Sequence, residues 1–200
     1  MRRAKPNTQG NLDGLCGLYA IVHFLRDLRD AEDRFIFGTY DDGSKPQAPD
    51  PEDRSRDAFW YVLDAAHRLQ MLSPDYFLVG FPAGHLVRIF NELRRDLGLG
   101  FYAVHFSDLA KLGKNHTFRT IAECVLTDGR PNAVIVGWDD HYFLAREFSG
   151  RSLVVEDSAP QEFRRSSLST IVIDEVRLSY SFALIKESSC LIKCLAERRS

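Results

Sequence analysis

The 200-residue sequence has no excess of basic residues and no long apolar run. Its formal net charge is -2, whereas nucleic-acid-binding proteins typically carry an excess of basic residues. No nucleic-acid partner is therefore expected. No apolar stretch approaches the roughly 20 residues of a membrane-spanning helix, which predicts a soluble chain without a membrane partner. The N-terminal charges are not followed by the apolar segment of a signal peptide. We therefore expect a cytoplasmic protein, or one delivered by a route that needs no signal peptide.

Cysteine is also scarce, with four residues in the chain. Cys16, Cys124, Cys190 and Cys194 are too few and too scattered for a disulfide framework, which indicates a reducing compartment. Cys190 and Cys194 have the spacing of a metal-ligand pair but no second pair accompanies them, so neither a metal nor a cofactor is expected. We interpret these two thiols as buried apolar groups.

Hydrophobic periodicity predicts helices in the first half and strands in the second. A polar loop rich in proline and glycine is expected over 38–54. This order favours a single α+β domain over 1–200 rather than alternating β-α-β units. The predicted helices are 13–33, 55–71, 83–97 and 118–126, and the predicted strands are 101–106, 133–138, 141–148, 152–156 and 180–185.

Cys16 is the candidate nucleophile. It stands at the predicted start of the first helix, where unpaired backbone N–H groups and the helix dipole favour a thiolate over a thiol. Gly14 and Gly17 flank it and leave room for a substrate. The alternative is a buried structural thiol, since free cysteine is among the most buried residue types. Gln9 precedes Cys16 and could donate its side-chain amide N–H to an oxyanion, together with the backbone N–H of Cys16. Asn7 is an alternative donor.

His141 is the candidate base among six histidines. It opens a predicted strand after a polar turn, whereas His23, His67 and His85 fall in predicted helices, His105 in a strand and His116 in a polar turn. An imidazole at a strand mouth can face a cleft while the following residues pack. This position distinguishes His141 from the other five.

Asp157 is the candidate group that orients the base. Gly150-Arg151 predicts a tight hairpin between the strand of His141 and the next strand, which ends at Asp157. His141 and Asp157 are symmetric about residue 149, so we expect them to be neighbours. A carboxylate there fixes the imidazole tautomer that serves a nucleophile. Asp139 and Asp140 are the competing candidates.

The order of these four residues resembles the papain-like cysteine peptidase superfamily. It is most similar to compact bacterial branches such as bacteriocin-leader-processing peptidases and papain-like effector proteases. The resemblance implies a nucleophile helix packed on a C-terminal antiparallel sheet, with Cys16 as nucleophile, His141 as general acid and base, and Asp157 as its orienter. It implies Gln9 and the Cys16 amide as the oxyanion hole. Ovarian-tumour-type deubiquitinases share Asp-Gly-Leu-Cys at 13–16 and His-Tyr at 141–142, but Phe143 replaces their usual polar orienter.

The reaction expected from these residues is hydrolysis of an amide, peptide or isopeptide bond through an acyl-enzyme on Cys16. Glutamine deamidation and transglutamination pass through the same acyl-enzyme and stay open. A binding module that keeps the fold without turnover is the alternative from a different class. The expected partner is a protein or peptide substrate, with a ubiquitin-like tail among the candidates.

Overall fold

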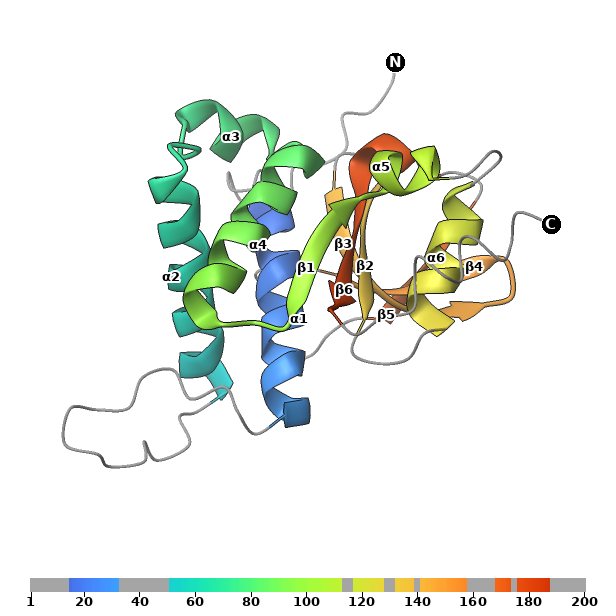
Figure 1. Ribbon diagram of the computed structural model, residues 1–200, viewed down its shortest axis with the longest axis horizontal. Coiled ribbons are helices and arrows are strands. Elements are labelled where there is room, and N and C mark those ends of the chain that lie inside the picture. Colours follow the sequence, from blue (N-terminus) through green and yellow to red (C-terminus); the bar gives the residue numbers. More distant parts are fainter. Residues whose placement is uncertain are drawn as a thin grey trace, which may run out of the picture.

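The computed structural model of the chain shows a mixed helical and antiparallel-sheet architecture, which confirms the predicted α+β class (Figure 1). No described helix is both long and apolar enough to cross a membrane. The structure describes residues 15–32, 51–112, 117–127, 132–138, 141–157, 168–173 and 176–187.

The helices follow the predicted hydrophobic periods closely. α4 is capped at its C-terminal end by Gly98, whose φ of 61° is the left-handed conformation that glycine adopts at little cost. The predicted loop 38–54 is wrong at its end, because α2 already begins at Pro51. Proline suits the first position of a helix, where its missing N–H has no partner to lose. The helices are α1 (Cys16–Glu32), α2 (Pro51–Arg68), α3 (Pro74–Val79), α4 (Ala83–Leu97), α5 (Phe106–Lys111) and α6 (Phe118–Thr127).

The six described strands form one sheet in which every pairing is antiparallel. Their order across the sheet is β1-β6-β2-β3-β4-β5. Gly150, with a φ of 62°, makes the predicted turn between β3 and β4. The strands are β1 (Phe101–His105), β2 (Ala133–Trp138), β3 (His141–Ser149), β4 (Ser152–Asp157), β5 (Leu168–Val172) and β6 (Ser181–Lys186).

Both faces of the sheet are covered by helices (Figure 1). In β2, Ala133 and Ile135 join a core with α1, α2 and α4, whereas Val134 and Val136 join a second core with α5 and α6. This alternation follows from the two-residue period of a strand. It explains why β2 is apolar throughout: each face packs against its own helices.

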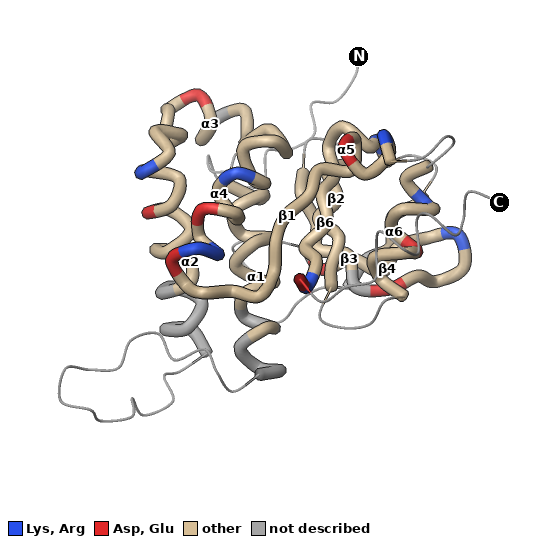
Figure 2. The backbone as a smooth tube through the Cα atoms, viewed as in Figure 1, with Lys and Arg blue, Asp and Glu red and all other residues tan. Residues whose placement is uncertain are grey.

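Acidic and basic residues lie close together along α2 and α4 (Figure 2). Arg68 of α2 pairs with Asp64 one turn earlier and with Asp96 of α4. These side chains are partly exposed, so the pairs add little stability but fix how the two polar faces meet.

Candidate functional site

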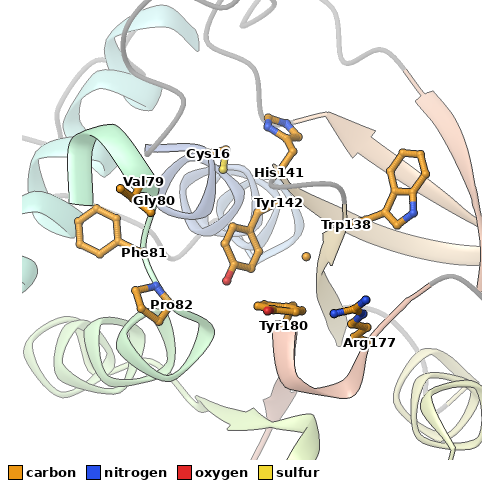
Figure 3. Close-up of a pocket in the computed structure, with 11 residues that line it drawn as sticks. Cys16, Val79, Gly80, Phe81, Pro82, Trp138, His141, Tyr142, Arg177 and Tyr180 are labelled. Atoms are coloured by element: carbon orange, nitrogen blue, oxygen red, sulfur yellow. The ribbon is translucent and has the colours of Figure 1, made fainter. Parts of the chain in front are cut away.

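A pocket of about 690 Å³ opens where the first turn of α1, the segment between α3 and α4, and the adjoining ends of β2 and β3 meet (Figure 3). A 3-10 helix, η4 (Leu178–Tyr180), forms a further wall. The pocket therefore collects residues from distant parts of the chain. Its lining residues are Cys16, Val79, Gly80, Phe81, Pro82, Gly137, Trp138, His141, Tyr142, Arg177 and Tyr180.

Cys16 is the first residue of α1 and lines this pocket although only 5% of its surface is exposed. The N–H groups of a helix's first turn have no partner within the helix, so the thiol stands where a negative charge is favoured. This helix-start position is the one that the sequence predicts. The sequence left two alternatives for Cys16, a buried structural thiol and a site residue. The structure is compatible with both, because Cys16 is buried and also lines the pocket.

Gly17 allows the start of α1 to approach its neighbours closely. A Cβ added there would lie 2.5 Å from Leu86 Cδ1 and 3.2 Å from Tyr142 Cδ2. The first distance is far below van der Waals contact, and Leu86 is fully buried between packed elements. Glycine at this position therefore lets Cys16 lie against β3.

His141 is the first residue of β3, is partly exposed and lines the same pocket. Its ring meets the ring of Phe143 edge-on, with centroids 4.6 Å apart and planes at 70°. Trp138, its cross-strand partner on β2, packs against Phe143 at 6.3 Å. The imidazole is thus packed against an aromatic pair, Trp138 of β2 and Phe143 of β3. In the view of Figure 3, Cys16 and His141 both lie along the upper edge of the pocket.

Tyr142 lines the pocket, and in Figure 3 its side chain lies between Cys16 and His141 on one side and Tyr180 on the other. Burial is the main cause that raises the pKa of its phenol well above the usual range, and negative charge on Cys16 and Tyr180 adds to it. The side chain therefore stays a neutral hydroxyl at every pH at which a cysteine nucleophile works. We expected Tyr142 only to pack, so its place in the pocket was missed.

Gly137 brings η4 to the pocket. A Cβ at this position would lie 2.5 Å from the backbone oxygen of Tyr180 and 2.7 Å from its Cβ. Only glycine allows such a close approach, and as a result Tyr180 and Arg177 reach the site. An isolated glycine inside an apolar strand is a known sign of close backbone approach, and this signal was available in the sequence.

The backbone of Asp157 lies in β4, but the predicted register of the hairpin is wrong by two residues. Asp157 pairs with Phe143 rather than with His141. The turn is flanked by Ser149 and Ser152, so its centre lies beyond residue 149 and by itself would shift the pairing by three residues; a bulge between Ala145 and Glu147 takes one residue of that shift back. His141 and Asp157 are therefore diagonal rather than direct neighbours.

The other expected site residues, Gln9, Asn7, Asp139 and Asp140, lie outside the described residues. Their predicted roles stay predictions, as does the side-chain role of Asp157. Cys190, Cys194 and His116 also lie outside the described part.

Three of the remaining histidines are not among the described lining residues of the pocket and have contacts of their own. His105 caps α5, where its Nδ1 accepts from the Ser107 N–H at 3.1 Å. His85 meets the ring of Tyr76 edge-on at 5.2 Å. His23 lies in the core of the protein beside Glu156. Of the described histidines, only His141 lines the pocket with Cys16.

Within the described part of the chain, no cluster of three or more His, Cys, Asp or Glu side chains has the arrangement of a metal site. The chain was compared with protein families, curated proteins and solved structures. No family model, curated protein or solved structure matches it.

Proposed function

We propose that the protein is a cysteine-nucleophile hydrolase that cleaves an amide, peptide or isopeptide bond. One observation carries the proposal: Cys16 at the start of α1 and His141 at the start of β3 line the same pocket. A buried thiol at a helix start and a partly exposed imidazole, in one cavity, are the pair that thiol hydrolysis requires.

The proposed reaction has two halves. His141 takes the proton of the Cys16 thiol, and the thiolate attacks the carbonyl carbon of the substrate. The C–N bond then breaks, the amine leaves with the proton from His141, and a thioester remains on Cys16. In the second half, water attacks the thioester, His141 removes a proton from that water, and the proton returns to the sulfur as the carboxylic acid leaves.

The negative oxygen that forms in each half needs hydrogen-bond donors. The backbone N–H of Cys16 lies in the first turn of α1, where N–H groups have no partner within the helix. We assign the second donor to Gln9 and the orientation of His141 to Asp157, on the sequence argument.

A papain-like architecture is part of the proposal. It is supported by α1, which carries Cys16 at its first residue and packs along an antiparallel sheet through Ile135, Tyr142 and Leu144. It is also supported by the position of His141 at the start of β3. This strand lies inside the sheet, between β2 and β4.

The test is the labelling of Cys16 by a thiol-directed activity probe, located by peptide mapping. Wild-type protein is expected to react at Cys16, and Cys16→Ala is expected to lose that label. Cys124→Ala is the matched control, because Cys124 is a fully buried thiol on α6 that does not line the pocket. His141→Ala is expected to slow labelling by roughly 100- to 10,000-fold, the range of general base catalysis.

Two results would contradict the proposal. One is folded wild-type protein whose Cys16 reacts no faster than Cys124. The other is a His141→Ala variant that is labelled as fast as the wild type. A protein that folds and binds a peptide partner equally well with Cys16→Ala, and turns over no substrate, would instead be a binding module.

A further inference from the structure

Arg177 occupies a firmly held backbone position at the edge of the pocket. It is the residue before η4, and its carbonyl oxygen accepts from the Tyr180 N–H and from the Ser181 hydroxyl, both at 3.2 Å. Ser181 is fully buried. The backbone is therefore fixed, while the side chain is exposed and extends along the pocket beside Tyr180 in the view of Figure 3.

The described lining residues of the pocket carry charge of one sign. Arg177 is the one permanently charged side chain among its described lining residues, and none of those residues is Asp or Glu. Within the described residues, no carboxylate lies within ion-pair distance of the Arg177 guanidinium. The positive end of α1 points to the same cavity. This contrasts with a chain whose net charge is -2.

The walls between Cys16 and Arg177 are apolar and aromatic. Val79 is 84% exposed and Tyr180 is 50% exposed, and both line the pocket. Tyr142 adds a phenol that burial keeps neutral. A negatively charged ligand therefore meets a cation and a neutral hydroxyl, next to surfaces that favour apolar groups.

On these grounds we propose that the pocket selects substrates that carry a carboxylate close to the bond that Cys16 attacks, with Arg177 as the group that binds it. A guanidinium can hold a carboxylate through two parallel N–H···O bonds, a geometry that lysine lacks. This inference rests on the proposed hydrolase function and adds a substrate class to it: acidic peptides. The carboxylate can come from a side chain or from a chain terminus.

The test compares three peptides of one sequence that carry an N-terminal chloroacetyl group as thiol electrophile. The first has glutamate next to the electrophile and an amidated C-terminus. The second has glutamine in its place and the same amide. The third has glutamine and a free C-terminal carboxylate. The measurement is the rate of Cys16 alkylation by peptide mapping, with iodoacetamide as a small neutral reference reagent.

Wild-type protein is expected to react about tenfold faster with a carboxylate peptide than with the fully amidated glutamine peptide. The first and third peptides distinguish a side-chain from a terminal carboxylate. Arg177→Gln is expected to remove the preference and Arg177→Glu to reverse it. Arg151→Gln is the matched control, because Arg151 is exposed in the β3–β4 turn and does not line the pocket. The preference is also expected to shrink as salt is added.

Equal rates for all three peptides, with Cys16 still reactive toward iodoacetamide, would overturn the carboxylate preference and leave the hydrolase proposal standing. A Cys16 that no reagent labels would overturn the hydrolase proposal. In that case, binding of the acetyl analogues of the same peptides to Cys16→Ala decides the recognition step: equal binding of acidic and amidated peptides overturns the role of Arg177.

Discussion

The buried imidazole of His23 on α1 faces the carboxylate of Glu156 on β4, with Nδ1 3.2 Å from Oε1. Both side chains are at least 95% shielded from solvent. His23 follows Cys16 by two helical turns, so the two share a face of α1. Glu156 is the residue before Asp157. The pair therefore connects α1, which begins with Cys16, to β4, the strand next to the strand of His141.

Removing one member of this pair is expected to cost far more stability than removing both. Glu156→Leu leaves a buried imidazole without its carboxylate and should lower the free energy of unfolding by roughly 3–5 kcal/mol. The double variant His23→Leu/Glu156→Leu replaces both polar groups by apolar ones and should be more stable than Glu156→Leu alone. Urea denaturation measures both.

The exposed pair Arg119–Glu123 on α6 is the control, with 2.8 Å between Arg119 Nε and Glu123 Oε1. Glu123→Gln is expected to change stability by less than about 1 kcal/mol. If the two changes at His23 and Glu156 simply add, the pair is not coupled and its proposed role in tying α1 to β4 is wrong.

Alkaline pH is expected to destabilise the protein through Tyr142 and Tyr19. Burial raises the pKa of both phenols above the value of about 10 that they have in the unfolded chain. The folded state therefore favours the neutral phenols. The stability that they contribute is present in full below about pH 10 and is lost as the pH rises further, because the unfolded chain then releases protons that the folded chain retains.

Urea denaturation between about pH 8 and pH 11, with tyrosinate absorbance as a second signal, tests this expectation. Tyr142→Phe should lose stability less steeply with pH than the wild type. Tyr61→Phe is the control, since Tyr61 is 38% exposed on α2. A Tyr142 that ionises together with the exposed tyrosines would refute the burial argument.

The elements that the sequence predicted best are those with a long hydrophobic period. The helix over 83–97 matches α4 at both ends, and the strands over 133–138 and 141–148 match β2 and β3 within one residue. α3 and α5 were missed, because six residues are too few to display a helical period. β5 was missed as well, since its place is set by pairing with β4 rather than by a strong pattern of its own.

The candidate site was predicted in part for the same physical reason. Cys16 and His141 each start an element, and element starts can be inferred from local pattern. Arg177 and Tyr180 reach the pocket through long-range packing at Gly137; the glycine marks a close backbone approach, but no local pattern specifies which segment approaches it. The predicted hairpin register was wrong because the turn lies between Ser149 and Ser152 rather than at residue 149; the bulge, which takes back one residue of the error, does not show in the alternation of apolar residues.

Two glycines, each the second residue of its helix, make a matched test of how closely α1 must pack. Gly17→Ala places a methyl group 2.5 Å from Leu86 Cδ1, whereas a Cβ at Gly84 of α4 meets nothing within 4 Å. Gly84→Ala should therefore raise stability by up to about 1 kcal/mol, since alanine favours the helix. Gly17→Ala should lower stability and slow the labelling of Cys16, as seen by urea denaturation and probe kinetics.

Leu86→Ala in the Gly17→Ala background removes the atoms that clash. The double variant should recover part of the labelling rate that Gly17→Ala loses, although Leu86→Ala alone leaves a cavity and costs roughly 2–5 kcal/mol. If Gly17→Ala and Gly84→Ala behave alike, close packing at the start of α1 does not position Cys16.

The bulge in the β3–β4 hairpin decides whether Asp157 can serve His141. Counted from the Ser149–Ser152 pair without a bulge, Asp157 would lie opposite Leu144, which packs on the α1 face of the sheet. Because the residue at 146 is unpaired, Asp157 lies opposite Phe143 instead. Phe143 is two residues from His141, and residues two apart on a strand point to the same face of the sheet. Diagonal neighbours of this kind are about 7–8 Å apart, within reach of side-chain contact.

Replacing Asp157 therefore tests whether it orients His141. Asp157→Ala is expected to slow Cys16 labelling by less than the loss of His141 itself and to shift the pH dependence of the rate, because the imidazole loses its orienting carboxylate. Asp157→Asn, which keeps an oxygen acceptor, should recover part of the rate. Asp139→Asn and Asp140→Asn are the parallel variants. A pH profile that moves with either of these two and not with Asp157 would assign the orienting role to the polar turn before β3.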